Sequence, residues 1–274
     1  YNSAKKCFYL GYELVVLALV CGRSLLPLNF MPRHSKIKKR KSKKTRRAQS
    51  KLRLALKLIT DALFCGIKVN YLVFDSWYFA LWFVRRLKEL GLHWVTVAKS
   101  NRIFIYQGRR IKAKSFVKLA LSAGGWPIKF IAELPKYGLV AVVVNFRRGK
   151  YEVLVTDDLA LSAEAVVRIY KKRWKIEMLF REAKQHYGLE NFHNQNWCAI
   201  IAHLALSLLA QFLVRFFVIF LKNQNYEIIK QTFQQTFIRI KKELKIPLGK
   251  WEFSFSEFLN CFKISKELQI CLLS

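Results

Sequence analysis

The sequence is poor in acidic residues and lacks any pattern of a metal-binding cage. Asp and Glu together number 17 against 49 Lys and Arg, so the net charge is +32 over 274 residues. An excess of this size opposes folding unless a polyanion neutralises it, and it lies far above the usual surface charge of a domain. The charge therefore predicts a nucleic-acid partner, with an anionic membrane surface or a merely solvated basic surface as alternatives.

The cysteines and histidines argue against a zinc-binding protein and against a disulfide-linked secreted protein. Six cysteines are scattered without a CxxC pair, and none of the five histidines has zinc-finger spacing. We expect reduced thiols, as in a cytosolic protein. No secretory leader precedes the first strand-like segment, and the chain begins at Tyr1 within that segment. We therefore expect the chain to be a fragment or the product of an interrupted reading frame.

The first hundred residues alternate between strand and helix patterns. Residues 10–19 and 24–30 predict a β-hairpin, and a basic arm follows at 33–53, where twelve of 21 residues are Lys or Arg. The alternative for the arm is a solvated, disordered connection. The pattern then predicts a helix, a strand, a helix and a strand, at 52–64, 69–74, 76–90 and 93–98. This order is typical of an α/β fold.

The remainder of the chain changes character twice. Glycine- and proline-rich turns separate β-branched runs at 99–160, which predicts a β-rich insertion. One long helix is then expected from Ser162, as its N-cap, to a stop at Gly188. Residues 199–221 approach the length of a membrane span. Three polar residues within this segment favour a buried helix of a soluble domain instead; they are His203, Gln211 and Arg215.

Four polar residues of the long helix have a regular spacing. Tyr170, Arg173, Glu177 and Lys184 fall at offsets of 0, 3, 7 and 14. On a continuous α-helix these offsets confine the side chains to an arc of about 60°. Such a stripe would present a carboxylate between cations, ready to meet a metal ion or a phosphate. The alternative is an ordinary ion-paired helix, because Arg173 and Glu177 are four residues apart.

A second polar position lies where a predicted strand ends. Asp75 follows the apolar run Val69, Leu72, Val73 and Phe74 and precedes a helical pattern. Functional groups collect at the carboxyl ends of strands in α/β sheets, so Asp75 is a candidate site residue. The alternative is a helix N-cap, for which Asp is a favoured residue.

Together these segments resemble a known family. The Tyr, Arg, Glu and Lys spacing resembles the YREK signature of bacterial insertion-sequence transposases of the DDE class. The segment Asp75-Ser76-Trp77-Tyr78 resembles the second-Asp motif of that family. Residues 156–189 are similar to the block in which the signature helix follows the last insertion strand.

The resemblance implies a ribonuclease-H-like core with a β-rich insertion, C-terminal helices and a missing first core strand. Its implied parts are a first core part at 1–98, the insertion at 99–160, a second core part at 161–222 and a helical region at 223–274. It also implies metal-dependent cleavage of transposon ends and strand transfer, with two Mg²⁺ or Mn²⁺ ions. Oxygen ligands suit these ions, which explains why no His or Cys cage is needed.

The resemblance also assigns individual roles. Asp75 and Glu177 would be catalytic carboxylates and metal ligands, while Tyr170, Arg173 and Lys184 would contact the DNA end. The family's first Asp lies on a strand ahead of the hairpin, and no acidic residue of this chain matches it. We therefore expect the chain alone to be inactive, and a non-catalytic DNA-binding remnant is the alternative function.

The same resemblance implies the binding partners of the protein and its location in the cell. The expected partners are double-stranded DNA, both transposon-end inverted repeats and target DNA, and a second copy of the chain in a homodimer. Arg40, Lys43 and Arg47 of the basic arm are expected to bind DNA backbone. We expect no membrane partner and a cytoplasmic, nucleoid-associated location. Trp126, in a Gly-Gly-Trp-Pro turn, either stacks on an unpaired base or serves as an ordinary core or turn residue.

Overall fold

The computed structural model describes residues 13–22, 24–33, 50–147, 149–191, 196–220 and 270–273. Its strands are β1 (Glu13–Cys21), β2 (Ser24–Arg33), β3 (Tyr71–Phe74), β4 (His93–Val97), β5 (Ile103–Tyr106), β6 (Arg109–Lys112), β7 (Ile128–Leu134), β8 (Gly138–Arg147), β9 (Lys150–Thr156) and β10 (Ile270–Leu273). Its helices are α1 (Lys51–Phe64), the 3-10 helix η1 (Ser76–Tyr78), α2 (Leu81–Glu89), α3 (Ala113–Ala123), α4 (Ala163–Lys171), α5 (Trp174–His186) and α6 (Trp197–Phe220).

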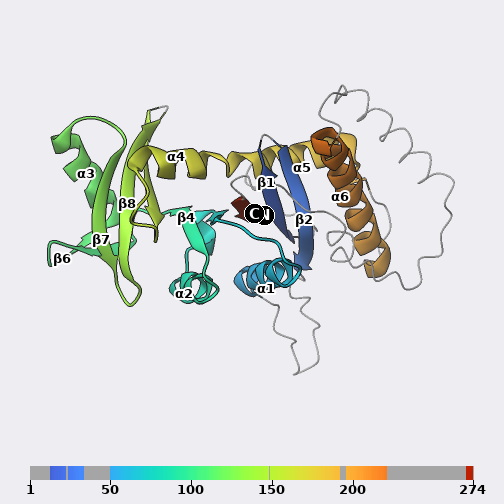
Figure 1. The fold of residues 1–274 in the computed structure, drawn as a ribbon, viewed down its shortest axis with the longest axis horizontal. Helices are drawn as coiled ribbons and strands as arrows, with labels where there is room; N and C mark the ends of the chain where they lie inside the picture. Colours follow the sequence, from blue (N-terminus) through green and yellow to red (C-terminus); the bar gives the residue numbers. More distant parts are fainter. Residues whose placement is uncertain are drawn as a thin grey trace, which may run out of the picture.

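One mixed sheet joins all the described strands. Its order is β2-β1-β10-β3-β4-β9-β8-β7-β5-β6. The strands β10, β3 and β4 are parallel to one another, whereas β1 and β9 pair with this group antiparallel. In Figure 1 the hairpin β1–β2 and the strands β7 and β8 lie toward opposite ends of the molecule, with β4 between them. The chain is therefore an α/β protein with a central mixed sheet.

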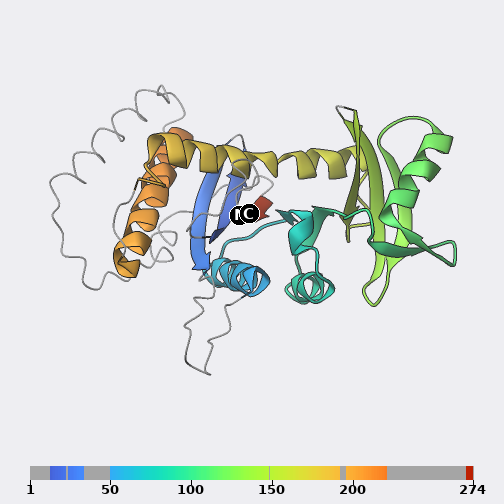
Figure 2. The ribbon, with the colours of Figure 1, turned by 180° about the vertical axis from the view of Figure 1, so that it is seen from behind.

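Helices cover both faces of this sheet. The helices α1 and α2 lie along one face, and α4 and α5 run along the other, as the two opposite views show (Figures 1 and 2). Each face has its own buried hydrophobic cluster, with Leu58 and Phe83 in one and Val166 and Ile176 in the other. Successive side chains of a strand point to opposite faces, so each central strand contributes to both clusters.

Several local expectations are confirmed. The hairpin forms as expected, and α1 begins after Ser50, whose hydroxyl accepts a hydrogen bond from the Arg53 N–H at 3.3 Å. Ser162 caps α4 in the same way, accepting from the Ala165 N–H at 3.2 Å. Gly188 adopts a φ of 63°, the left-handed conformation that ends a helix. The predicted start signal at Ser162 and stop signal at Gly188 therefore mark real helix ends.

Three local expectations were wrong. The segment 76–90 is not one helix, because the 3-10 turn η1 ends at Tyr78 and α2 starts only at Leu81. The span 99–160 contains the helix α3, which the β-rich interpretation did not include. The long helix is broken between Lys171 and Trp174, where hydrogen bonds to the third preceding carbonyl replace α-helical ones.

The apolar helix α6 packs beside β2 and α5. Residues Trp197–Phe216 are long and apolar enough to cross a membrane by composition, with a mean hydropathy of 2.0. Its polar side chains nevertheless contact the protein. His203 Nε2 lies 2.6 Å from the Gly188 carbonyl oxygen, buried Gln211 donates to the Leu179 carbonyl at 3.0 Å, and Arg215 pairs with Glu182. These contacts match the expected buried helix.

Candidate functional site

Asp75 lies at the carboxyl end of β3, directly after buried Phe74. Its side chain is exposed, and its Oδ1 accepts a hydrogen bond from the Ser76 N–H at 2.5 Å. The carboxylate thus caps the short turn η1, so the N-cap interpretation holds locally. A cap of one 3-10 turn leaves the exposed carboxylate open toward solvent, where it can still meet a ligand.

The joint between α4 and α5 brings three signature residues together. Arg173 donates to Glu177 Oε1 at 2.6 Å, and its guanidinium carbon stands 6.0 Å from the centroid of the Tyr170 ring. The Arg173 side chain is 23% exposed and that of Glu177 is 40% exposed. The Arg173 guanidinium therefore lies between a phenol and a carboxylate, at the boundary between core and solvent.

The charge of Asp75 acts on this joint. Burial raises the pKa of Tyr170 to about 12, and Asp75 and Glu152 add to this effect while Arg173 opposes it. Burial works against the charge of Arg173, but Tyr170, Glu177 and Asp75 outweigh it and raise the pKa of the guanidinium. The Asp75 carboxylate thus influences two residues of the α4–α5 joint, although it comes from a distant part of the sequence.

The alternation of the strands explains this convergence. Val73 belongs to the cluster under α4 and α5, and Asp75, with an extended backbone, follows two residues later on the same face. Leu154 of β9 belongs to that cluster too, and Glu152 precedes it by two residues. Ala98 N–H bonds to the Val153 carbonyl at 2.8 Å, which places the start of β9 at the carboxyl end of β4. Sequence reasoning missed Glu152, although the period-2 pattern of 150–156 could have indicated its face.

The remaining predicted site residues lie apart from this group or outside the described residues. Lys184 pairs with Glu190 at 2.5 Å, and the break in the helix removes the continuous stripe on which its expected position rested. Arg40, Lys43 and Arg47 lie outside the described residues. The part of the chain that the structure describes contains no group of three or more His, Cys, Asp or Glu side chains able to hold a metal ion.

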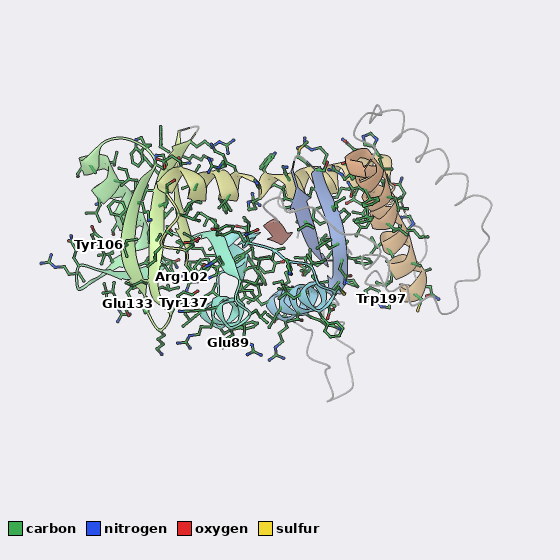
Figure 3. The ribbon with its side chains drawn as sticks, viewed as in Figure 1. Glu89, Arg102, Tyr106, Glu133, Tyr137 and Trp197 are labelled. Atoms are coloured by element: carbon green, nitrogen blue, oxygen red, sulfur yellow. The ribbon has the colours of Figure 1, made fainter. Side chains whose placement is uncertain are left out.

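The opposite end of β3 and β4 also carries acidic residues, in a buried network. Asp157 accepts hydrogen bonds from the Trp94 N–H at 2.9 Å and the Tyr137 hydroxyl at 3.3 Å, and lies 3.4 Å from His93 Nδ1. Asp158 accepts from the Tyr71 hydroxyl at 2.6 Å. Tyr137, labelled in Figure 3, comes from the β7–β8 turn; its hydroxyl accepts from Trp94 Nε1 of β4 at 2.9 Å, and Lys88 Nζ of α2 lies 5.2 Å from its ring centroid. This network fastens the 99–160 segment to the core strands.

Trp126 belongs to a surface cluster of aromatic rings. Its centroid lies 5.4 Å from that of Tyr151 and 6.2 Å from that of Phe146. All three side chains are more than a third exposed. Trp126 is thus a partly exposed member of a cluster at the end of β8 and β9, and its contact with an unpaired base stays a prediction.

The fold and the site define an α/β protein with a polar group at the carboxyl edge of its mixed sheet. The chain matches the family described as "Transposase DDE domain" over residues 2–213, and it belongs to that family. It is 30% identical over 147 residues, 52% of its length, to "Putative transposase y4zB" of Sinorhizobium fredii, strain NBRC 101917 / NGR234.

A solved structure of the piggyBac transposase synaptic complex with hairpin DNA is also similar, at 12% identity with a TM-score of 0.48 over 82% of this chain. The chain spans 41% of the length of the Sinorhizobium relative and 46% of that of the piggyBac chain.

Proposed function

We propose that this chain is the catalytic part of a DNA transposase of the YREK branch, with a ribonuclease-H-like core, in which Asp75 and Glu177 are two of the carboxylates. The observation that supports this most is the polar group at the α4–α5 joint, where Arg173 pairs with Glu177 and the charge of Asp75 bears on Tyr170 and Arg173. The reaction of the intact enzyme is cleavage of transposon ends and strand transfer.

The residues present suit divalent ions of the Mg²⁺ type. Asp75 offers an exposed carboxylate, and Glu177 offers a second one once Arg173 turns from it to a DNA phosphate. Mg²⁺ needs only one or two protein carboxylates, because it keeps waters and takes phosphate oxygens. Two such ions, when bound, activate the attacking oxygen and stabilise the leaving one.

The other residues of the joint would position the DNA strand. The planar guanidinium of Arg173 can fork onto a phosphate, and Glu177 would then be free to face a metal ion. The Tyr170 hydroxyl, whose raised pKa keeps it protonated, can donate a hydrogen bond to a phosphate oxygen. Lys184 would supply a further charge along α5.

No residue of this chain matches the first catalytic Asp that the resemblance implies. The resemblance places the strand that would carry this Asp ahead of the hairpin in the sequence. In this sheet β10 lies between β1 and β3, antiparallel to the first and parallel to the second. Its residues are Ile270, Cys271, Leu272 and Leu273, none of which has a carboxylate. The strand between β1 and β3 therefore supplies no carboxylate, and we propose that the chain alone does not cleave DNA.

A metal-binding measurement tests the carboxylate pair without requiring cleavage. Mn²⁺ binding is followed by electron paramagnetic resonance in the presence of duplex DNA. Asp75→Asn and Glu177→Gln should each weaken binding at least about tenfold, since each removes a charged ligand. Glu89→Gln, an exposed carboxylate on α2, is the matched control and should leave binding unchanged. Unchanged Mn²⁺ binding in the two site variants would refute the pair.

A nicking assay separates the enzyme from the non-catalytic remnant. With Mg²⁺ and supercoiled plasmid, the chain alone should bind DNA without nicking it. Nicking that Asp75→Asn abolishes would contradict the proposed inactivity and establish the enzyme. Loss of both nicking and Mn²⁺ binding, with DNA binding intact, would favour the remnant that holds or blocks transposon ends.

The basic arm and the homodimer are part of the same proposal. Alanine at Arg40, Lys43 and Arg47 should weaken binding evenly across duplex sequences and make its salt dependence shallower, because backbone contacts release counterions. Sedimentation on end-containing duplexes should show two chains per complex. We propose a cytoplasmic, nucleoid-associated location because the chain's partner is chromosomal DNA.

A further inference from the structure

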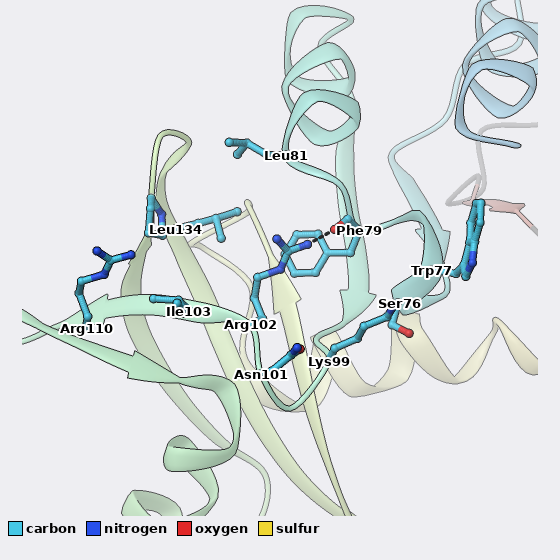
Figure 4. Close-up of a pocket in the computed structure, with 11 residues that line it drawn as sticks. Ser76, Trp77, Phe79, Leu81, Lys99, Asn101, Arg102, Ile103, Arg110 and Leu134 are labelled. Carbon is cyan, nitrogen blue, oxygen red and sulfur yellow. Dashed lines mark hydrogen bonds between the residues drawn. The ribbon is translucent and has the colours of Figure 1, made fainter. Parts of the chain in front are cut away.

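A hollow of about 470 Å³ lies beside the connection that follows β3, on the face of the sheet that carries α2. Its walls come from the connection after β3, the turn between β4 and β5, the strand β6 and the β7–β8 turn (Figure 4). The volume falls within the range of small-ligand sites. Four different segments thus line one open hollow, and the first of them begins one residue after Asp75.

The walls carry positive charge without a balancing acid. Lys99, Arg102 and Arg110 line the hollow, and no Asp or Glu does. Within the described ranges none of these three cations forms an ion pair with a carboxylate. A group of unneutralised cations around a concave surface attracts anions.

Arg102 is held in a way that leaves it free for an anion. Its guanidinium donates to the Phe79 carbonyl and stands 4.3 Å from the centroid of the Phe79 ring (Figure 4). Burial lowers the pKa of Arg102, and no carboxylate compensates for this. Since the guanidinium has five N–H donors, a single carbonyl partner leaves others for phosphate oxygens.

Trp77 adds an aromatic wall to this basic site. Its side chain is 49% exposed although it lies two residues after Asp75, at the edge of the hollow. Lys51 Nζ, which pairs with Glu13 at 3.3 Å, stands 5.2 Å from the ring centroid. Exposed aromatic rings beside basic side chains are typical of sites where single-stranded nucleic acid stacks its bases.

We propose that the hollow binds one nucleotide of a DNA strand, with the phosphate on Lys99, Arg102 and Arg110 and the base against Trp77. This rests on the proposed function in one respect, that the DNA strand lies at the Asp75 edge. The hollow would then hold one nucleotide of that strand on the face of the sheet opposite to the α4–α5 joint.

Binding of a fluorescent ten-nucleotide oligothymidylate in metal-free buffer tests whether the cations of the hollow hold the phosphate. The double variant Lys99→Gln with Arg110→Gln should bind at least about tenfold more weakly than the wild type, with a salt slope shallower by about 0.7, the value for one phosphate of a single strand. The control is Lys57→Gln with Lys118→Gln, two exposed lysines on α1 and α3 that remove the same charge. Equal losses in the two double variants would overturn the proposal.

A comparison of normal and abasic oligonucleotides tests whether the base stacks on Trp77. The wild type should prefer oligothymidylate to an abasic strand of equal length by at least about fivefold, since stacking on an aromatic ring favours bases. Trp77→Leu should abolish this preference and Trp77→Phe should retain most of it. A preference that survives in Trp77→Leu would exclude Trp77 from the site.

Competition distinguishes a nucleotide from a free anion. Thymidine monophosphate should displace the oligonucleotide at concentrations where inorganic phosphate does not, and equal displacement by both would overturn the nucleotide assignment. These assays contain no metal, so they are independent of the carboxylate pair. If the wild type binds the oligonucleotide but does not bind Mn²⁺, the proposed function is refuted and the nucleotide site is not.

Discussion

The two ends of strands β3 and β4 carry acidic residues in opposite circumstances. At the carboxyl end, Asp75 is exposed, with one hydrogen bond to its own neighbouring N–H, and its charge acts on Tyr170 and Arg173. At the amino end, the Asp157 side chain is only 10% exposed and has partners from two other segments. The satisfied acid stabilises the fold, whereas the open one can bind a ligand.

The sharpest way to break this comparison is to remove each carboxylate in turn. Asp157→Ala should lower the free energy of unfolding by about 2 kcal/mol, because it leaves the Trp94 N–H and the Tyr137 hydroxyl without their buried acceptor. Asp75→Ala should change it by less than about 0.5 kcal/mol, as for an ordinary surface substitution. Urea unfolding followed by circular dichroism measures both, and equal losses would erase the distinction.

The response to pH separates the two ends further. Burial raises the pKa of Asp157, against hydrogen bonding and His93, which lower it. A carboxyl group whose pKa is higher in the folded state than in the unfolded state favours folding when protonated, and this contribution is lost as the pH rises through the folded pKa. Asp157→Asn should therefore be more stable than the wild type at pH 7, and the difference should shrink as the pH falls toward 4.

The matched control for this experiment is Asp75→Asn. This variant removes an exposed carboxylate and leaves the Asp157 network untouched. A constant difference for Asp157→Asn would show that its buried charge is fully compensated by His93 and the hydrogen bonds.

The smallest expected effect concerns affinity for DNA. In metal-free buffer Glu177→Gln should bind duplex DNA about threefold more tightly than the wild type, because it removes a carboxylate that holds Arg173 and repels phosphate. Asp157→Asn should not change the affinity. Fluorescence anisotropy measures both, and tighter binding by the Asp157 variant would show that charge alone, and not position, sets the affinity.

The local signals of the sequence predicted much of the α/β fold. Alternation and periodicity located β1, β2, α1 and β4, and the caps at Ser162 and Gly188 were correctly placed. These features depend on residues close together in the chain, so a linear pattern contains them.

What was missed depends on contacts between distant segments or on a misinterpreted pattern. The apolar spacing of Ala113, Phe116, Val117 and Ala120 is helical and could have predicted α3, but the surrounding turns favoured strands. The break at Lys172–Arg173 has no Gly or Pro to signal it. The pairing of β10 with β3 joins positions about two hundred residues apart, which no local pattern specifies.

The candidate site was predicted in part for the same reason. The spacing of Tyr170, Arg173 and Glu177 survives the break because all three lie within two turns of it. Lys184 is a further two turns away, and Glu190 takes it as a partner. Glu152 could not be placed without the strand register that carries β9 to the edge beside Asp75.

The helices α4 and α5 contact different parts of the molecule on the two sides of the α4–α5 joint. The helix α4 contacts β4, β8 and β9, whereas α5 contacts β2 and α6, and the two run nearly end to end across the molecule (Figure 1). A tilt of these strands against the hairpin would bend the chain between Lys171 and Trp174, where the α-helical hydrogen bonds are interrupted. Tyr170 belongs to α4 and Glu177 to α5. Bending at the α4–α5 joint would therefore change the distance between these two side chains, which Arg173 contacts on either side.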